Sequence, residues 1–303
     1  MGVISSLGPA PGQPTVDAAR CLRCGRCAAI CPTEVLLPDS VAITVDNSIN
    51  FGCIACGQCM TVCPNGSITV TGRDLSPADL TDLPSREERA TPPQLAALMR
   101  SRRSIRRFSD REIHRAIIER IVEAAACAPM AIPPSEVGIT VVNGRAKVAE
   151  LSRDVAKGYA GLLKFMDNGA ARLLGRVLMK RTTYDRFDSF IIPLARVIVD
   201  GDRQGKDYVL YHAPAALIFH VSPYTDTADA DIACTYAMLA AEAEGLGSCM
   251  IGCTAPILAR SADLKQKYRI PERHTPALVL ILGYHDGAHK KGIKRRFRTV
   301  EYM

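Results

Sequence analysis

The sequence predicts an α+β protein in two unequal parts, a small cysteine-rich domain followed by a larger domain whose central sheet is flanked by helices. Two observations predict this division. The run CLRCGRCAAICP recurs 32 residues later as CIACGQCMTVCP, and beyond a polar, proline-rich stretch short apolar runs alternate with long helical patterns. We expect a tail over 1–16, the cysteine-rich domain over 17–72, a linker over 73–90 and the larger domain over 91–303.

Composition indicates a folded protein with redox or metal chemistry. The 303 residues are 48% hydrophobic and 23% charged, and they include 12 cysteines. No run approaches the ~20 apolar residues of a membrane helix, and the N-terminal sequence has no secretory pattern. Cysteines in such a chain favour metal or redox chemistry in a reducing compartment over disulfides. We therefore expect a cytoplasmic protein that does not associate with membranes.

The positive charge is unevenly distributed. The chain carries a net charge of +7, but residues 1–72 hold three arginines and four acidic residues, which leaves about +8 for the remainder. Attraction for anionic ligands is therefore expected in the larger domain.

Both cysteine runs follow the pattern C-x2-C-x2-C-x3-C-P. A structural zinc site usually combines two C-x2-C pairs across a longer loop. Three cysteines spaced in this way, with a fourth before proline, are typical of paired [4Fe–4S] clusters in which the fourth cysteine binds the other cluster. One predicted set of ligands is Cys21, Cys24, Cys27 and Cys63, and the other is Cys53, Cys56, Cys59 and Cys31. A pair of zinc knuckles, or a purely structural cluster, is the alternative.

Residues 17–72 resemble a bacterial two-cluster ferredoxin in this double motif. Gly25 and Gly57 recur at equivalent positions, where we expect the backbone to bend close to the sulfurs. VAITVD (41–46) alternates like a strand, and SITV (67–70) is expected to pair with it. Two adjacent clusters would form an electron relay, and a relay requires an electron acceptor.

Helices and strands of the larger domain are predicted from periodicity and capping signals. Thr91 and Gln94 form a candidate capping box for a first helix. A second helix is expected to begin at Ser109 or Asp110 and to end before Pro129. Further helices are predicted at 145–166, 170–182 and 227–244, and strands at 138–142, 215–222 and 277–283.

Familiar nucleotide and hydrolase motifs are missing from the larger domain. GLGSCMIG (245–252) follows a predicted helix and lacks the third glycine of a dinucleotide-binding turn, so we interpret it as a helix stop with a close backbone approach. Two basic runs remain, SRRSIRR (101–107) and HKKGIKRRFR (289–298). They indicate either one phosphate held from both ends of the domain or two solvated faces. No nucleic-acid partner is expected, because interleaved aromatics are lacking.

From about residue 91 onward the chain resembles the FMN-dependent nitroreductase family. The segments that carry the resemblance are RRSIRRF (102–108), AACAP (125–129), YHAPAALI (211–218), GLGSCMIG (245–252) and KRRFR (294–298). The resemblance implies that FMN is bound at the interface of a homodimer. It implies that the phosphate and ribityl chain contact Arg102, Arg103, Ser104 and Arg106, with Arg295 or Arg296 from the tail. It places Met130, Ala131, Ile251 and Gly252 near the flavin ring.

The sequence also departs from that family. MAIPPSEV follows AACAP where many relatives carry an Asn and a Gln-Pro-aromatic run, and Cys249, Met250 and Cys253 stand near the expected flavin, so no catalytic acid is assigned. Four cysteines exceed what two clusters need and are expected to be small buried hydrophobes: Cys127, Cys234, Cys249 and Cys253. The alternative places Cys249 and Cys253 close to flavin or substrate. The aromatic residues of 161–190 either stack on a planar substrate or make core and dimer contacts.

Together these features predict an iron–sulfur flavoprotein oxidoreductase. Two [4Fe–4S] clusters would relay single electrons to FMN, which would reduce a small electron-poor acceptor such as a nitroaromatic or a quinone. The donor would be a ferredoxin-type carrier or NAD(P)H. The alternative is an electron-transfer module that serves a partner protein and has no substrate of its own.

Overall fold

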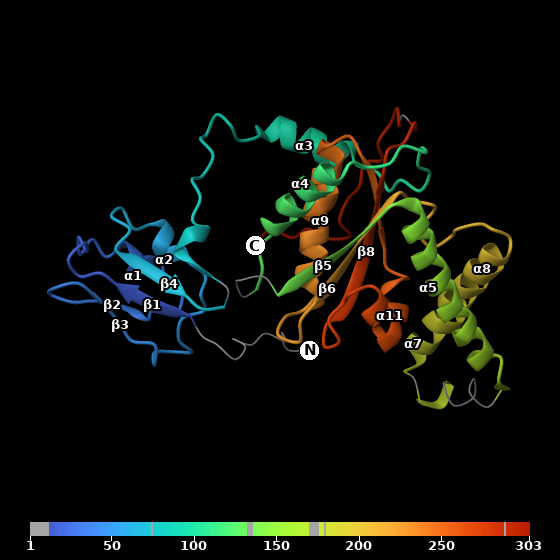
Figure 1. The fold of residues 1–303 in the computed structure, drawn as a ribbon, viewed down its shortest axis with the longest axis horizontal. Helices are drawn as coiled ribbons and strands as arrows, with labels where there is room; N and C mark the ends of the chain where they lie inside the picture. Colours follow the sequence, from blue (N-terminus) through green and yellow to red (C-terminus); the bar gives the residue numbers. More distant parts are fainter. Residues whose placement is uncertain (1–11, 74, 132–135, 170–175, 179, 288) are drawn as a thin grey trace.

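The structure is a computed structural model that describes residues 12–73, 75–131, 136–169, 176–178, 180–287 and 289–303. It contains a small cysteine-rich domain and a larger α+β domain (Figure 1). The extended chain between them includes a short 3₁₀ turn, Pro77–Asp79, and leads into helix α3. Among the described residues, no helix has both the length and the apolar character needed to cross a bilayer.

The small domain contains two short antiparallel strand pairs and two short helices. Strand β1 (Gln13–Val16) pairs with β4 (Ile68–Thr71), and β2 (Leu36–Pro38) pairs with β3 (Ile43–Val45). The helices are α1 (Arg26–Ile30) and α2 (Gln58–Thr61). The expected pairing of 67–70 with 41–46 is therefore wrong. Its actual partner β1 lies within the predicted tail, so the ordered chain begins before Asp17.

The larger domain has a four-stranded antiparallel sheet in the order β5–β6–β8–β7. The strands are β5 (Val137–Asn143), β6 (Ala215–Val221), β7 (Gly247–Ile251) and β8 (Thr275–Gly283). The three strands predicted at 138–142, 215–222 and 277–283 are confirmed. Strand β7 was not predicted, because its short sequence GSCMI follows glycine signals that indicated only a helix stop.

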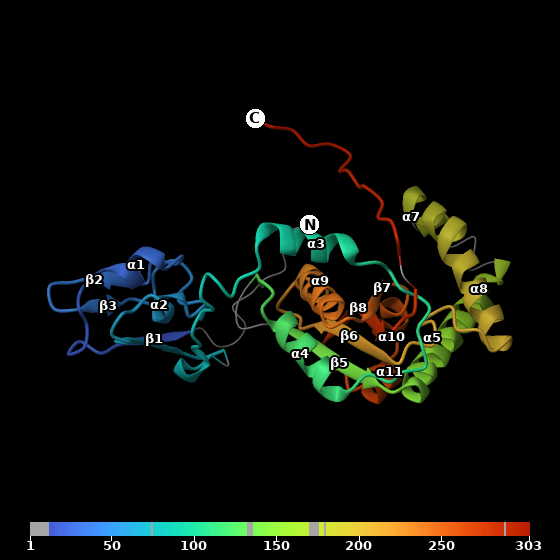
Figure 2. The same cartoon turned by 90° about the horizontal axis from the view of Figure 1, so that it is seen from above.

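Helices cover both faces of this sheet, as Figures 1 and 2 show. All seven residues of β6 are buried. Ile218 and Ile281 join the apolar core under α5 (Arg145–Met166) and α8 (Ile192–Arg203), whereas Leu217 and Leu280 join the core under α4 (Arg115–Ala126) and α9 (Thr227–Ala243). The alternation of strand side chains thus divides the core into two layers.

Other helices complete the domain. They are α3 (Pro92–Ser101), α7 (Arg181–Arg186), a π-helical turn (Phe187–Ile191), α10 (Ala255–Ala259) and α11 (Ala262–Lys267). The capping box is confirmed, since the Thr91 backbone N–H donates to Gln94 Oε1 at 2.8 Å. Of the helix predicted at 170–182, residues 170–175 and 179 lie outside the described residues.

Helix α4 begins later than predicted. Its N-cap is His114, whose Nδ1 accepts from the Ala116 N–H at 3.3 Å, rather than Ser109 or Asp110. Residues 105–109 are instead bound to the sheet: the Ser109 N–H donates to the Tyr284 carbonyl at 2.8 Å, and the Arg145 guanidinium donates to the Ser109 carbonyl. These tertiary contacts override the local capping signal.

Candidate functional site

The arginine-rich segment runs along the edge of the sheet. Ser104 forms an isolated parallel bridge with Ser248 of β7, and the Ile105 N–H donates to the Ser248 carbonyl at 2.9 Å. Two glycines permit this approach. A Cβ at Gly247 would lie 2.7 Å from the Ile105 side chain, and one at Gly283 would lie 2.5 Å from Phe108. The expected close backbone approach at 245–252 is therefore confirmed.

A cavity of about 1000 Å³ adjoins this segment. It is lined by Met99, Arg100, Arg102, Arg103, Ser104, Arg106, Gly292, Ile293, Lys294 and Arg295. The predicted phosphate residues on both basic runs thus meet at one cavity, and the tail residue that lines it is Arg295 rather than Arg296. Part of the hydrogen-bonding capacity of Arg103 is used within its own segment, because its guanidinium donates to the carbonyls of Arg100 and Arg102 at 2.6 and 2.7 Å.

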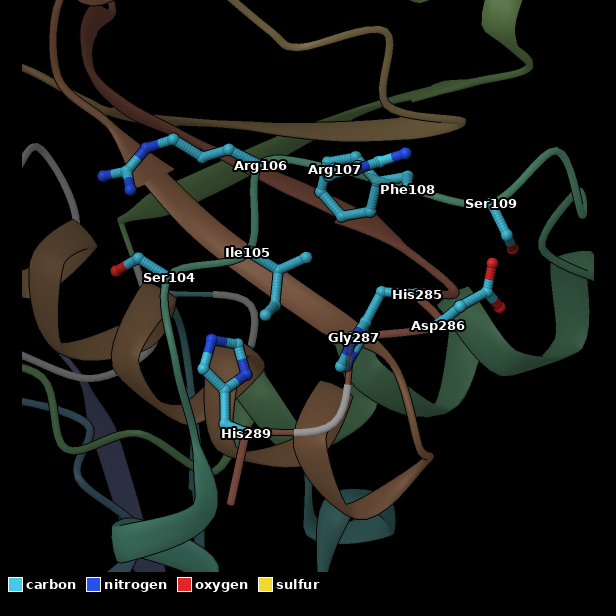
Figure 3. Close-up of a pocket in the computed structure, with 10 residues that line it drawn as sticks. All are labelled: Ser104, Ile105, Arg106, Arg107, Phe108, Ser109, His285, Asp286, Gly287 and His289. Carbon is cyan, nitrogen blue, oxygen red and sulfur yellow. The ribbon is translucent and has the colours of Figure 1, made fainter. Parts of the chain in front are cut away.

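A second cavity, of about 490 Å³, lies beside residues 104–109 and is drawn in Figure 3. The chain after β8 closes it with His285, Asp286, Gly287 and His289. The side chains of Arg106 and Arg107 extend in opposite directions from this segment (Figure 3). Arg106 lines both cavities. Ser104 lines both as well, so these two residues lie between the two spaces.

Arg106 also faces a tyrosine whose role the sequence left unassigned. Its Cζ lies 5.8 Å from the centroid of the Tyr211 ring. Tyr211 and His212 both have left-handed backbone conformations, with φ of 55° and 52°. Asp207 stabilises this turn, since its carboxylate accepts from the backbone N–H groups of Val209, Leu210 and His212 at 2.8–2.9 Å. The signal in the sequence was the YHAPAALI motif.

Tyr211 and Cys249 are neutral groups beside this arginine. Burial raises the pKa of Tyr211, and the positive charge of Arg106 opposes that shift. Burial also raises the pKa of the Cys249 thiol, while Arg106 and a hydrogen bond with Ser104 oppose it. Cys249 is only 1% exposed. No ionised acid from these two residues offsets the charge of Arg106.

The other residues predicted near the flavin line neither cavity. Ile251 is buried in the core at the end of β7, and Gly252 is exposed, with open space where a Cβ would stand. Met130 packs against the core of α4 and α9, and the Ala131 N–H donates to Asp229 Oδ2 at 3.2 Å. Their contact with a flavin stays a prediction.

The cysteines of the small domain surround two separate cavities. One is lined by Cys21, Cys24, Cys27 and Cys63, and the other by Cys31, Cys53, Cys56 and Cys59. These are the two crossed sets expected from the motif spacing. All twelve cysteines of the chain are free thiols; of the four outside these sets, Cys234 and Cys249 are buried as expected, whereas Cys127 is exposed, so the expectation of burial is wrong for it. Among the described residues, no group of three or more His, Cys, Asp and Glu side chains converges on a position that could hold one metal ion. The thiols of each set instead line a cavity.

The sequence repeat is also a backbone repeat. Gly25 and Gly57 have φ of 70° and 71°, and Arg23 and Ala55 share a φ of 54°. Each pair is 32 residues apart. The turns bring main-chain N–H groups to sulfur: the Arg23 N–H donates to Cys21 Sγ and the Ala55 N–H to Cys53 Sγ, both at 3.4 Å. Such bonds stabilise the negative charge of cluster thiolates.

The chemistry of the thiols fits an iron–sulfur group. Burial raises the pKa of Cys59 to about 12, and Coulombic repulsion from Cys53, Cys56 and Cys31 adds to this effect. Those three are the other members of its set, so four thiolates there require compensating positive charge. Burial also acts on Cys63, but hydrogen bonds from Ser67, Asn65 and Ile68 together outweigh it and lower the pKa of that thiol. The thiolate form binds metal.

Comparison with protein families decides the relationship. Residues 99–284, more than half of the chain, match the model of the Nitroreductase family. The chain belongs to the nitroreductase family. Residues 20–68 match the model of the 4Fe-4S dicluster domain, which covers both cysteine motifs. The predicted resemblances of both parts are therefore confirmed.

One solved nitroreductase shows the same fold, and two others are similar at lower scores. A nitroreductase with bound FMN from Bacteroides fragilis is 21% identical, with a TM-score of 0.51, and the match covers 69% of this chain and 98% of that one. An FMN-dependent nitroreductase from Clostridium difficile is 19% identical, covering 70% and 100%, with a TM-score of 0.49. One with bound FMN from Desulfitobacterium hafniense is 20% identical, covering 68% and 97%, with a TM-score of 0.47. Among curated proteins nothing matches.

Proposed function

We propose that this nitroreductase-family protein is an iron–sulfur flavoprotein oxidoreductase that reduces a small, electron-poor organic acceptor such as a nitroaromatic or a quinone. FMN would bind in the arginine-lined cavity, and two [4Fe–4S] clusters would bind in the small domain. One observation carries the proposal: Arg102, Arg106 and Arg295, from basic runs nearly 200 residues apart, line the same cavity. The nitroreductase from Bacteroides fragilis that shares the fold contains FMN.

The cavity offers the groups that a phosphate ester requires. Guanidinium forks of Arg102 and Arg106 bind phosphate oxygens through charge-assisted hydrogen bonds, and the Ser104 hydroxyl adds a neutral donor. Ser104 is fixed against β7, so these donors are positioned by the sheet rather than by a free loop. Bound FMN supplies the conversion between single-electron and two-electron transfer. The positive charge of Arg106 stabilises negative charge that develops next to it.

Arg106 is exposed, so its charge is available to a ligand in the cavity. Cys249 is buried beneath the segment, and Tyr211 lies on one side of the guanidinium, with its ring centroid 5.8 Å from Cζ. We assign no proton donor. Burial raises the pKa of Cys249 and of Cys253, so neither thiol releases its proton readily.

The small domain would hold its clusters through the two crossed sets of thiols. Cys31 and Cys63 carry the hydroxyl neighbours Thr33 and Ser67, which favour the thiolate. Main-chain N–H groups of Arg23 and Ala55 point at sulfur in each set. A reducing, cytoplasmic compartment is part of the proposal, since all of these sulfurs must remain free of disulfides.

A homodimer is also part of the proposal. The C-terminal segment extends away from the larger domain in Figure 2. It presents exposed apolar side chains, with Phe297 86% and Tyr302 95% exposed. An arm of this kind gains stability by packing on a second copy. Light scattering on the full chain tests this part, and a monomer would contradict it.

The experiment that tests the function is anaerobic purification followed by iron, sulfide and flavin analysis of one sample. The expected result is about eight iron and eight sulfide with one FMN per chain, because each [4Fe–4S] cluster needs four of each. Turnover of a nitroaromatic should then exceed that of free FMN at the same concentration. Zinc in place of iron, or iron without flavin, would refute the proposal. Cofactors without turnover would favour the electron-transfer module.

A further inference from the structure

The two halves of the small domain differ in charge at equivalent positions. Arg20, Arg23 and Arg26 surround the first cysteine motif, whereas the residues 32 positions later are Gly52, Ala55 and Gln58. The backbone repeats closely at these turns, so the fold itself does not require the arginines. Ala55 has the same φ of 54° as Arg23. The positive charge is therefore a property of one site only.

The three arginines lie at the surface of the first site, where the Arg23 guanidinium donates to the Ser40 carbonyl at 2.6 Å. Arg23 and Arg26 line the first cavity, and the Arg20 guanidinium donates to the carbonyl of Asn65, which also lines it. All three residues are exposed. Within the described part of the chain, no carboxylate lies within ion-pair distance of their guanidinium groups. These guanidinium groups therefore have no ion-pair partner within the described part of the protein.

The first site is also the more open of the two. Leu22 is 60% exposed, and Cys24 is exposed. The equivalent residues Ile54 and Cys56 are only partly exposed, and Ala55 between them is fully buried. An apolar side chain and a ligand sulfur thus reach the surface inside a ring of positive charge.

The second site is covered by chain that leads elsewhere in the protein. The Gly12 N–H donates to the Cys53 carbonyl at 2.8 Å, and Leu75 lies against Gly57. Arg73, two residues before Leu75, forms an ion pair with Glu136 of the larger domain at 3.1 Å. In Figures 1 and 2, α2 lies nearer to the larger domain than α1 does. The first site therefore faces outward, and the second adjoins the connection.

We propose that the surface formed by Arg20, Leu22, Arg23, Cys24 and Arg26, the arginine face, docks an acidic electron-carrier protein. The inference rests on the proposed function and names the donor class and its entry point. Basic residues around a small apolar centre suit a brief, electrostatically steered encounter. At each encounter one electron leaves the reduced carrier, which returns to its oxidised form, and no proton or covalent bond is exchanged at this surface.

The equivalent residues of the second cysteine motif define the test variant. Arg23→Ala with Arg26→Gln gives the first half the residues of the second half, and alanine already occupies the same left-handed conformation at position 55. The probe is a purified acidic ferredoxin, titrated in its oxidised form into the loaded full chain by calorimetry at several salt concentrations. We expect the variant to bind about tenfold more weakly at low salt and to lose most of the salt dependence.

A control variant removes equal charge elsewhere. Arg203→Gln with Arg269→Ala changes two exposed arginines of the larger domain, one of which also has a left-handed backbone, with φ of 52°. This control should bind the carrier as the wild type does. If both variants weaken binding equally, net charge alone is responsible and the arginine face is refuted. If the wild type does not bind the carrier, or if the arginines instead promote binding to anionic phosphatidylserine vesicles, the proposed partner is wrong.

Iron, sulfide and flavin contents of the same samples separate this inference from the proposed function. Loaded protein whose carrier binding is unaffected by Arg23→Ala with Arg26→Gln overturns the docking surface and leaves the flavoprotein assignment standing. Protein that lacks iron or flavin overturns the assignment itself, and the docking surface fails with it.

Discussion

Ser104 and Ser248 form the parallel β-bridge that joins the arginine-rich segment to the edge strand β7. The bridge extends the sheet by a few residues and fixes the direction of the side chains that follow. Because side chains alternate along an extended segment, Ser104 and Arg106 share one side while Ile105 packs against Gly247 on the other. The proposed phosphate recognition would thus depend on the same contacts that complete the sheet.

The double variant Arg102→Ala with Arg106→Ala is expected to lose FMN. Hydrogen bonds to charged groups are worth about 1.5–3 kcal/mol each, so removing both guanidinium groups should weaken binding at least about 100-fold. Flavin retained per chain after gel filtration measures this. Arg203→Ala with Arg269→Ala is the control, since both residues lie outside the cavity lining. Full flavin content in the first variant would contradict the phosphate assignment.

Gly247→Ala tests the close approach of the segment to the sheet. The new Cβ would lie 2.7 Å from Ile105 and would push the segment outward, at a cost of about 1–3 kcal/mol in the free energy of unfolding. We expect a lower melting temperature and weaker FMN binding together. Gly161→Ala in α5 meets nothing within 4 Å and should raise stability by about 0.5–1 kcal/mol. Equal behaviour of the two variants would argue against the proposed packing.

Crossed ligation makes a specific prediction for Cys31. This residue belongs to the first motif but lines the cavity of the second set. Cys31→Ser should therefore perturb the same electron paramagnetic resonance signal as Cys53→Ser, and Cys63→Ser the same signal as Cys21→Ser. If instead Cys31→Ser and Cys21→Ser alter one signal in common, the ligands are not crossed.

His220 makes stability depend on pH. Burial lowers its pKa to about 4, and the neighbouring His274 adds to the shift through a 2.9 Å contact between their Nδ1 atoms. A folded-state pKa below the ordinary value of about 6.5 means that the folded protein favours the neutral ring. The contribution of His220 to the free energy of unfolding is therefore fully present above pH 6.5 and is lost as the pH falls towards 4. The loss should reach about 2–3 kcal/mol, since His220 is only 5% exposed.

His220→Asn measures this contribution. Urea unfolding of the full chain between pH 7.5 and pH 4.5 should show a shallower decline for the variant than for the wild type. Because His274 contacts His220 at 2.9 Å, the difference in slope measures the contribution of the histidine pair. Parallel declines would show that the pair carries no such charge penalty.

Local spacing made the grouping of the eight cysteines into two crossed sets predictable. The cysteines, their glycines and the following prolines act within a dozen residues, and the crossed sets appear in the structure as expected. Strand β1 escaped prediction because Gln13–Val16 has no pattern of its own and becomes a strand only through pairing with β4. Helix α4 starts at Arg115 because Ser109 is held by Tyr284 and Arg145, two partners remote in sequence.

The larger site was predictable in composition but not in geometry. The two basic runs were identified, yet only the fold shows that Arg295, and not Arg296, lines the cavity with Arg102. Tyr211 was overlooked as a neighbour of Arg106 because their proximity depends on a left-handed turn that Asp207 stabilises. Such contacts join residues about 100 positions apart, where periodicity carries no information.

The matched turns of the small domain bear on how it arose. Neither 32-residue half contains a complete set of ligands, because Cys31 serves one site and Cys63 serves the other. An ancestral half could have held metal only as a symmetric pair of identical peptides. Joining two such halves in one chain raises the effective concentration of each missing ligand. It also lets the halves differ, as the arginines of one half and the covered surface of the other do.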